Sequence, residues 1–437
     1  MSQPEPDTRL ELDVGEMTYG ASALARTEDG QVVFVDDALP GERVIAAVGK
    51  RKRRYLQARA QQVLQASPRR VAPPCPYVPA CGGCQWQHAE YEAQVEMKAR
   101  VLAETLRRAG VSAPVAAVIP SDEPFRYRIR GEFHVVPPAT DGAFQLGFNR
   151  RRTYEVVAVE DCLIHHANVA DALPGIRRAL DRAGAGTARS LRLTAHPERR
   201  ELLWQALGGA APDGLQDALS GELPGYLVHQ DSLSLEYDAS RIDGRAGEAL
   251  VFRVDSGAFV QVNHDLAHRL YAIALGYIGD RPGQLLEGYA GFGAMSVLAA
   301  TRPDPAARPT RVTMVEESRP AVVLARLHIR LHQVENASIL PGRLEDRLAQ
   351  VEPEEVDSVL IDPPRAGMTP PVVDELVRLA PERIVYVSCD PATLARDLAS
   401  LADDGYTVQA QTLVDMFPQT YHVETVSLLQ RDRNVAR

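Results

Sequence analysis

The second half of the chain alternates short apolar runs with helix-forming stretches, and no other feature constrains the fold as strongly. Strands that alternate with helices pack as a parallel sheet with helices on both faces. From about Phe252 onward we therefore predict an α/β domain. The expected strands lie at 285–286, 312–315, 356–361, 384–387, 407–413 and 422–429.

Side chains that can bind or react follow several of these strands, at the edge where open α/β sheets bind ligands. They are Glu287, Glu316, Asp362 and Cys389. The glycine-rich turn at 287–293, with Glu316 at the family-typical spacing of about 20 residues, predicts a nucleoside pocket in which the acid binds ribose hydroxyls. The three-glycine dinucleotide fingerprint and a Walker lysine are missing. The pattern therefore favours S-adenosylmethionine over a nicotinamide or a triphosphate.

Cys389 lies between the apolar run at 384–387 and a predicted helix with Pro391 in its first turn, where a missing N–H costs nothing. The partial positive charge of a helix N-terminus stabilises a thiolate, the reactive form of cysteine. The alternative is a buried structural cysteine. The position at a strand end favours a nucleophile.

The first 66 residues alternate short apolar strands with turn residues, as at Gly15 and Gly30. Five short strands in this length predict a small closed barrel of the oligonucleotide-binding type. The alternative is an interaction module that binds no nucleic acid. Although the net charge of the chain is −10, basic clusters in its first third favour RNA. These clusters are 50–54, Arg69-Arg70, Arg126/Arg128/Arg130 and 150–152.

Three cysteines, Cys75, Cys81 and Cys84, stand close together with two glycines between them, and Cys162 is a fourth. Such a set of thiols predicts a soft-metal site. The spacing is not a usual zinc pattern, so we favour an iron–sulfur cluster over zinc. Possible alternative ligands are His88, His165 and His166.

The composition fits a chain of two or three domains, with 437 residues of which 45% are hydrophobic. No stretch approaches the length of a membrane span, and the polar, acidic N-terminus does not resemble a signal or transit peptide. Five cysteines, an odd number, argue against a secreted disulfide framework. We therefore expect a cytoplasmic protein without membrane contact. A helix is expected at 91–109 and mostly β structure at 115–250.

Four separated motifs together resemble the RNA uracil-C5 methyltransferase family. They are the runs FVQVN at 259–263, EGYAGFG at 287–293, DPPRAG at 362–367, and SCDP at 388–391 with FPQTYHVE at 417–424. The opening barrel resembles the TRAM domain of the same proteins. The set Cys75, Cys81, Cys84 and Cys162 resembles the 4Fe-4S iron–sulfur cluster of the branch that methylates 23S ribosomal RNA. The likeness runs over nearly the whole chain.

The resemblance implies a covalent reaction on a uridine that has been flipped out of its stack. Cys389 would add to C6 so that C5 can take a methyl group from S-adenosylmethionine, and Glu424 would then remove the C5 proton. From Phe252 onward Cys389 is the only cysteine, whereas a cytosine-C5 enzyme would have two, so uracil is favoured. The S-adenosylmethionine pocket would be lined by Gln261, Tyr289, Glu316 and Asp362, with Glu316 at the ribose.

Three positions depart from the family pattern. Glu287 stands where the family more often has aspartate, Ala290 where it has cysteine, and Asp390 where it has asparagine. A carboxylate beside a thiolate raises its pKa. Asp390 is therefore expected to raise the pKa of Cys389 unless its carboxylate points away.

We predict three parts: a TRAM-like RNA-binding barrel at 1–66, a β-rich central domain with the cysteine metal site at 67–252, and a Rossmann-like methyltransferase domain at 253–437. The helix at 91–109 is expected to pack on the last part. We expect a monomer that acts on 23S ribosomal RNA. The alternatives are the same reaction on transfer RNA, or an inactive, metal-stabilised RNA-binding protein. The modified uridine is not encoded in these motifs.

Overall fold

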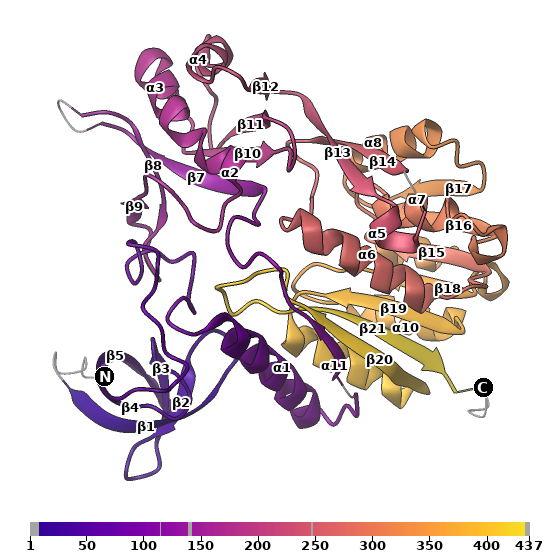
Figure 1. The fold of residues 1–437 in the computed structure, drawn as a ribbon. Coiled ribbons are helices and arrows are strands. Elements are labelled where there is room, and N and C mark those ends of the chain that lie inside the picture. The colour runs from indigo at the N-terminus through magenta and orange to yellow at the C-terminus, as the bar shows by residue number, and fades with distance from the viewer. Residues whose placement is uncertain (1–7, 114, 139–141, 246–247, 433–437) are drawn as a thin grey trace. The chain divides into compact units, whose positions relative to one another are not determined.

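The computed structural model describes residues 8–432, except 114, 139–141 and 246–247. The chain divides into two compact units (Figure 1). Unit 1 comprises Met1–Glu104, Phe148–Val157 and Phe417–His422, and unit 2 comprises Thr105–Gly147, Ala158–Met416 and Val423–Arg437. Within the described part, no helix combines the length and the hydropathy that crossing a membrane requires.

Unit 1 begins with a closed barrel of five strands in the order β1-β2-β3-β5-β4, drawn in indigo in Figure 1. The prediction of a barrel is thus confirmed. Burial alternates along the strands, so that Val33 and Val35 of β3 and Val44 and Ala46 of β4 point inward and are fully buried. The elements are β1 (Arg9–Met17), β2 (Ala23–Arg26), β3 (Val32–Asp36), β4 (Arg43–Arg51) and β5 (Tyr55–Gln65), followed by helix α1 (Tyr91–Arg108).

The middle of the chain forms a six-stranded sheet in the order β12-β11-β10-β7-β8-β9 and a two-stranded ribbon of β13 and β14. The region is β-rich as predicted, but its alanine-rich stretches form helices. The strands are β7 (Arg130–Val136), β8 (Gln145–Asn149), β9 (Val156–Ala158), β10 (Ser190–Ala195), β11 (Glu201–Leu207), β12 (Leu227–His229), β13 (Ser232–Asp238) and β14 (Ala249–Asp255). The helices are α2 (Ala167–Ala170), α3 (Leu173–Ala183), α4 (Leu215–Glu222) and α5 (Ser240–Asp243).

Unit 2 contains the predicted α/β domain, built on an eight-stranded sheet in the order β17-β16-β15-β18-β19-β21-β20-β6. Strands β15, β16, β17, β18 and β19 are parallel, and β21 runs antiparallel to β19 and β20. The strands are β6 (Val115–Ile119), β15 (Gln284–Gly288), β16 (Arg311–Glu316), β17 (Ala337–Pro341), β18 (Ser358–Ile361), β19 (Arg383–Ser388), β20 (Tyr406–Val414) and β21 (Glu424–Arg431).

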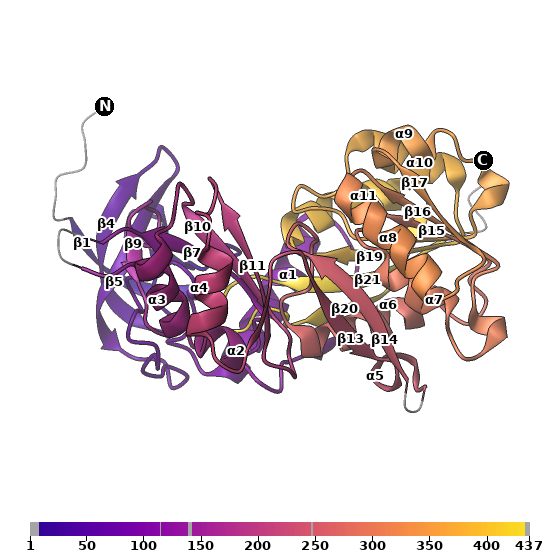
Figure 2. The same cartoon turned by 90° about the horizontal axis from the view of Figure 1, so that it is seen from above.

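Helices cover both faces of this sheet, as Figures 1 and 2 show. Helices α6, α7 and α8 contact one another along one face, and α9, α10 and α11 do so along the other. The fold is therefore the Rossmann-like arrangement expected of an S-adenosylmethionine-dependent methyltransferase. The helices are α6 (His264–Ile278), α7 (Ala294–Ala300), α8 (Arg319–Leu331), α9 (Leu344–Leu348), α10 (Pro370–Leu379) and α11 (Pro391–Asp403), with single 3₁₀ turns at η1 (Pro305–Ala307) and η2 (Pro353–Glu355).

Strand β6 was expected to belong to the central β segment. It instead pairs in parallel with β20 and forms one edge of the eight-stranded sheet. Pairing between strands so far apart in sequence leaves no local signal, because β6 alone reads only as a short apolar run.

Candidate active site

Cys389 follows strand β19 at the carboxyl edge of the eight-stranded sheet. Parallel pairing aligns the carboxyl ends of β15, β18 and β19 at this edge. Asp362 comes directly after β18, Glu316 is the last residue of β16, and Glu287 is the penultimate residue of β15. The four predicted groups therefore lie along one edge, where open α/β sheets bind their ligands.

An antiparallel strand brings Glu424 to Cys389. Strand β21 begins at Glu424 and pairs with β19 through Ser388 and Thr425. The Thr425 hydroxyl also donates a hydrogen bond of 3.2 Å to the Ser388 carbonyl. In this register the next positions outward are Cys389 and Glu424, so the two predicted catalytic residues are neighbours across the two strands.

The Cys389 thiol is half-buried. Burial, followed by the nearby carboxyls of Glu424 and Asp362, raises the pKa of the thiol to about 12, whereas the Arg365 guanidinium lowers it. Burial and the two acids therefore oppose the effect expected from the N-terminus of α11, which favours the thiolate.

Two carboxyls stand beside the thiol, that of the buried Glu424 and that of the half-buried Asp362. Glu424 is 3% exposed. Burial, and then the neighbouring Asp362, raises the pKa of Glu424 well above its ordinary value, while Arg365 lowers it. Burial also raises the pKa of Asp362 to about 7. Neighbouring carboxyls do not both ionise readily, so Asp362 favours the protonated form of Glu424.

The loop after β18 carries Arg365, a residue to which we had given no role. A buried clamp on α11 fixes this loop. The Asp397 carboxylate accepts hydrogen bonds from the Met368 N–H (2.8 Å) and the Tyr386 hydroxyl (2.7 Å). Arg396 donates to the carbonyls of Ala366 (3.0 Å) and Met368 (2.9 Å). The only sequence signal for this arrangement was the positive charge inside the DPPRAG motif.

Asp390 caps helix α11. Its carboxylate accepts hydrogen bonds from the backbone N–H groups of Ala392 (2.9 Å) and Thr393 (3.1 Å). Asparagine is an equally good cap, so the exchange from asparagine preserves the local structure. Asp390 raises the pKa of Cys389, as expected, but its effect is smaller than those of burial, Glu424 and Asp362.

The glycine-rich turn is tied to the two acids that flank it. Glu316 accepts hydrogen bonds from the N–H groups of Gly291 (2.8 Å) and Ser318 (2.7 Å), which fixes the turn against the start of α8. Glu287 is buried and accepts a hydrogen bond from the Ser296 N–H (3.1 Å). Burial raises the pKa of Glu287 to about 8. Glu287 thus stabilises the turn from a buried position, whereas Glu316 remains partly exposed at the carboxyl edge of the sheet.

Tyr289 and Gln261, the other two residues predicted to bind the methyl donor, lie in two segments of unit 2. Tyr289 has a φ of +56°, a backbone conformation that is uncommon for residues other than glycine. Such local strain often marks a functional turn. Gln261 is buried two residues before Asn263, whose side chain caps α6 by accepting a hydrogen bond from the Leu266 N–H (3.2 Å).

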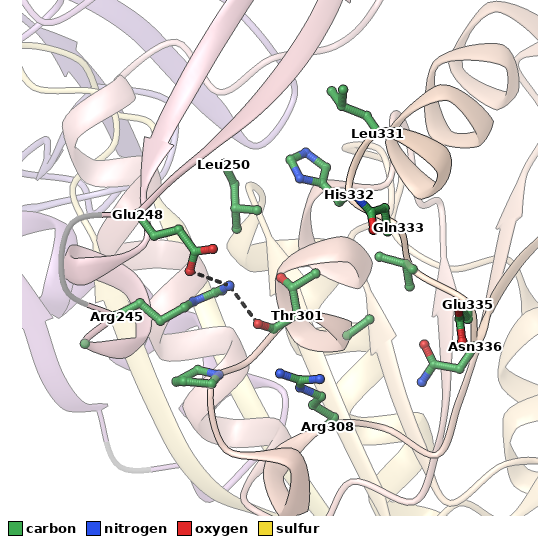
Figure 3. A pocket seen from close by; sticks show the side chains of 14 residues that line it. Arg245, Glu248, Leu250, Thr301, Arg308, Leu331, His332, Gln333, Glu335 and Asn336 are labelled. Atoms are coloured by element: carbon green, nitrogen blue, oxygen red, sulfur yellow. Dashed lines mark hydrogen bonds and ion pairs between the residues drawn. The ribbon is translucent and has the colours of Figure 1, made fainter.

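A cavity of about 940 Å³ lies elsewhere in unit 2 (Figure 3). Its lining residues include Thr301 at the end of α7, Arg308 before β16 and Asn336 before β17. These positions lie at the amino ends of the strands, opposite to Cys389. Arg245 crosses the cavity wall and donates a hydrogen bond to the Thr301 carbonyl (2.7 Å). The cavity is therefore separate from the candidate active site.

The four predicted metal ligands fall in both units: Cys75, Cys81 and Cys84 belong to unit 1 and Cys162 to unit 2. Among the described residues, which include all five cysteines, there is no disulfide and no group of three or more His, Cys, Asp or Glu side chains arranged to hold a metal ion. Packing against the backbone accounts for the glycine at position 82, because a side chain there would meet a carbonyl oxygen at 2.9 Å. The metal site is therefore not confirmed.

Of the three histidines considered as alternative metal ligands, two are buried and the third caps a helix. Burial lowers the pKa of His88 to about 4, and burial lowers that of His165 well below its ordinary value. The His166 ring accepts a hydrogen bond of 3.2 Å from the Asn168 N–H and thereby caps α2.

Three of the four basic clusters are used inside the protein. Arg70 pairs with the buried Glu42, and Arg126 pairs with Asp161. Arg151 donates hydrogen bonds to Asp37 and to the Cys84 carbonyl. Only the run at 50–54 is exposed throughout, and in the part of the chain that the structure describes it forms no ion pair. It ends β4 and continues through the turn to β5.

Comparison with known proteins agrees with this arrangement. The profile of the family described as tRNA (Uracil-5-)-methyltransferase matches residues 233–432, and that of the TRAM domain matches residues 7–60. The crystal structure of the Pyrococcus abyssi tRNA (uracil-54, C5)-methyltransferase, in complex with S-adenosyl-L-homocysteine, superposes with a TM-score of 0.71. It covers 96% of this chain and 100% of its own at 21% identity, which shows a shared fold.

Two relatives share more of the sequence. A protein of Streptomyces avermitilis, named only as an RNA methyltransferase, is 34% identical over 96% of this chain and 98% of its own length. The 23S rRNA (uracil(1939)-C(5))-methyltransferase RlmD of Halomonas elongata is 32% identical over 98% of this chain and 91% of its own. The chain therefore belongs to the RNA uracil-C5 methyltransferase family and is an S-adenosylmethionine-dependent RNA methyltransferase.

Proposed function

We propose that Cys389 and Glu424 methylate C5 of a uridine in 23S ribosomal RNA through a covalent adduct. The observation that supports this most directly is the register of β19 and β21, in which Cys389 and Glu424 follow the Ser388–Thr425 pair. A nucleophile and a base are thereby held side by side on rigid strands, next to the acids at the other strand ends.

In the first step the Cys389 thiolate adds to C6 of the uracil, the C5=C6 bond opens, and the electron pair moves into an enolate. C5 then attacks the methyl group of bound S-adenosylmethionine, the bond between that methyl group and the sulfonium sulfur breaks, and S-adenosylhomocysteine leaves. C5 now carries both a methyl group and its original proton. A sulfonium cation close to Cys389 would lower the pKa of the thiol and so favour the attacking thiolate.

In the second step the Glu424 carboxylate takes the proton from C5. The electron pair of the C5–H bond restores the C5=C6 bond, the C6–S bond breaks, and Cys389 leaves as a thiolate. Without a base the methylated adduct persists. Arg365, Asp362 and the bound donor set the charge around Glu424. This charge decides whether Glu424 is protonated or can act as a base.

Gln261, Tyr289, Glu316 and Asp362 are proposed to bind the methyl donor. Glu316 is only partly exposed and two of its acceptor positions already bind backbone N–H groups, so its remaining lone pairs would meet the ribose hydroxyls. We also propose what the sequence led us to expect: a division into three parts at residues 66 and 252, a monomeric state and a cytoplasmic location.

An iron–sulfur cluster on Cys75, Cys81, Cys84 and Cys162 is the second part of the proposal. Four thiolates are the ligand set that such clusters use. The Gly83 N–H donates a 3.4 Å hydrogen bond to the Cys81 sulfur, a contact of the kind that tunes cluster sulfurs. Because the described side chains form no metal-holding group, the support is the sequence pattern and this contact, and no step of the reaction passes through the cluster.

Iron and acid-labile sulfide, measured after anaerobic purification, test the cluster. About four of each per chain are expected for a 4Fe-4S centre. Zinc without sulfide would favour the alternative site, and no metal would remove this part of the proposal. We expect the cluster to be structural, so methylation should persist as long as the fold does.

The reaction is tested with RNA that contains 5-fluorouridine, mixed with the protein and S-adenosylmethionine and resolved on a denaturing gel. Fluorine at C5 cannot leave as a proton, so a covalent protein–RNA band is expected with 23S fragments and none with Cys389→Ala. The 32% identical relative named for 23S ribosomal RNA supports that substrate. A band with transfer RNA alone would keep the chemistry and change the substrate. No band with any RNA would leave an inactive RNA-binding protein.

A further inference from the structure

The segment just before Glu424 folds with the other unit. Phe417–His422, here called the strap, belongs to unit 1, although Met416 before it and Val423 after it belong to unit 2. Glu424 is the second residue after the chain has returned to unit 2. Whatever fixes the strap in unit 1 therefore limits where the main chain enters β21.

Two residues of α1 hold the strap. Gln94 and Lys98 are four positions apart, so they lie on one face of the helix. The Gln94 side chain accepts a hydrogen bond from the Gln419 N–H and donates one to the Gln419 side-chain oxygen, both of 2.9 Å. The Lys98 ammonium donates a hydrogen bond of 2.9 Å to the Phe417 carbonyl. Gln94 is 1% exposed and Lys98 0%.

The rest of the strap is equally fixed within unit 1. The Gln419 carbonyl accepts hydrogen bonds from the N–H groups of Gln85 (3.0 Å) and Trp86 (3.1 Å). The Tyr421 ring meets the Tyr19 ring edge-on at 5.4 Å and packs against the barrel core. Gln419 has a φ of +69°, a conformation that costs free energy in a residue with a side chain and persists only where contacts enforce it.

We propose that Gln94 and Lys98 are positioning residues for Glu424: by fixing the strap in unit 1, they hold the general base where it takes the C5 proton. The inference rests on the proposed function, because it presumes that Glu424 is that base. A buried ammonium or amide costs free energy unless it forms hydrogen bonds, and bonds of this kind tie Lys98 to the Phe417 carbonyl and Gln94 to the N–H and the side-chain oxygen of Gln419.

The step that depends on this positioning is the last one. Glu424 accepts the C5 proton, the C5–H electron pair forms the C5=C6 bond, and the C6–S bond breaks to release the Cys389 thiolate. Addition of Cys389 and methyl transfer precede it and do not use Glu424 as a base. A displaced strap therefore slows resolution of the adduct and leaves its formation unchanged.

The test uses the full-length Gln94→Met and Lys98→Met variants, in which an unbranched side chain of similar length replaces each polar one. With ordinary uridine RNA we expect kcat to fall about tenfold or more, because a displaced base loses much of its effect. A covalent adduct should accumulate on denaturing gels, and KM for RNA should fall together with kcat, so that kcat/KM is unchanged because adduct formation is unaffected. With 5-fluorouridine RNA the adduct should form at the wild-type rate.

Two further variants make the result specific. Arg100→Met alters the same helix at a side chain that is 62% exposed, and should behave as the wild type. Gln94→Glu should restore resolution, because a buried, protonated glutamate offers the same donor and acceptor to Gln419. If either methionine variant fails to fold, as judged by its unfolding midpoint, the comparison of Gln94→Glu with the remaining one decides.

Slower adduct formation, weaker RNA binding, or wild-type turnover in folded methionine variants would overturn the proposal, because the strap would then serve folding or RNA binding alone. This failure is distinct from failure of the proposed function. In that case wild-type protein itself would form no adduct with 5-fluorouridine RNA, and both proposals would fall.

Discussion

At the scale of single residues, Glu424 separates the two halves of the reaction. We predict that Glu424→Gln forms the methylated adduct with ordinary uridine RNA but resolves it at least about a hundredfold more slowly, since general bases contribute such factors. The measurement is the covalent fraction on a denaturing gel alongside released 5-methyluridine. Glu335→Gln, an exposed change near the amino ends of the strands, is the matched control. Rapid release of product from Glu424→Gln would assign the base elsewhere.

At the same scale, Glu287 makes the free energy of unfolding depend on pH. Burial raises its pKa from 4.5 to about 8 in the folded protein. A raised folded pKa contributes stability that is complete below pH 4.5 and is lost as the pH rises toward 8, because the unfolded carboxyl loses its proton first. Relative to the wild type, the unfolding midpoint of Glu287→Gln should rise between pH 5 and pH 8. An equal difference at both pH values would contradict a buried, protonated Glu287.

At the scale of elements, we predict that the exposed, basic turn from β4 to β5 contacts RNA. Lys52→Ala/Arg53→Ala/Arg54→Ala should weaken RNA binding and reduce the slope of log affinity against log salt by about 2, since each lost phosphate contact removes about 0.7 for single strands. Arg43→Ala, an exposed arginine paired with Glu11 on the same barrel, should leave the slope unchanged. An unchanged slope in the triple variant would place the RNA on another surface.

The elements also show what the sequence can and cannot predict. The barrel and the strand–helix alternation were predictable because each strand carries its own apolar pattern, and the reactive groups were predictable because they follow those strands. Gln94 and Lys98 were not, because the strap residues to which they bond lie more than three hundred positions away in the sequence. Arg126 belongs to a basic cluster that favours phosphate contacts by its sequence, yet its guanidinium pairs with Asp161. A cluster of charges in the sequence does not reveal which residues pair with it in the folded protein.

At the scale of the whole molecule, the chain passes repeatedly between its two units. The pattern of strands and helices along the sequence is therefore a poor guide to where a folding unit ends. The catalytic sheet takes its edge strand β6 from residues 115–119, long before the change of pattern at Phe252. Strand β21 is reached only through the strap, which is fixed in unit 1. Val423 is the only residue between the strap and Glu424.

The predicted boundary at residue 252 can be tested through β6. A fragment of residues 253–437 lacks β6 and leaves the nine-residue strand β20 as an open edge. Unpaired edges of this kind associate with one another. We expect this fragment to aggregate in size-exclusion chromatography, whereas residues 105–437, which keep β6 and the β13–β14 ribbon, should be more soluble and unfold at a higher temperature. A monodisperse 253–437 fragment as stable as the longer one would show that the catalytic sheet is complete without β6, and that the early strand serves only to connect the units.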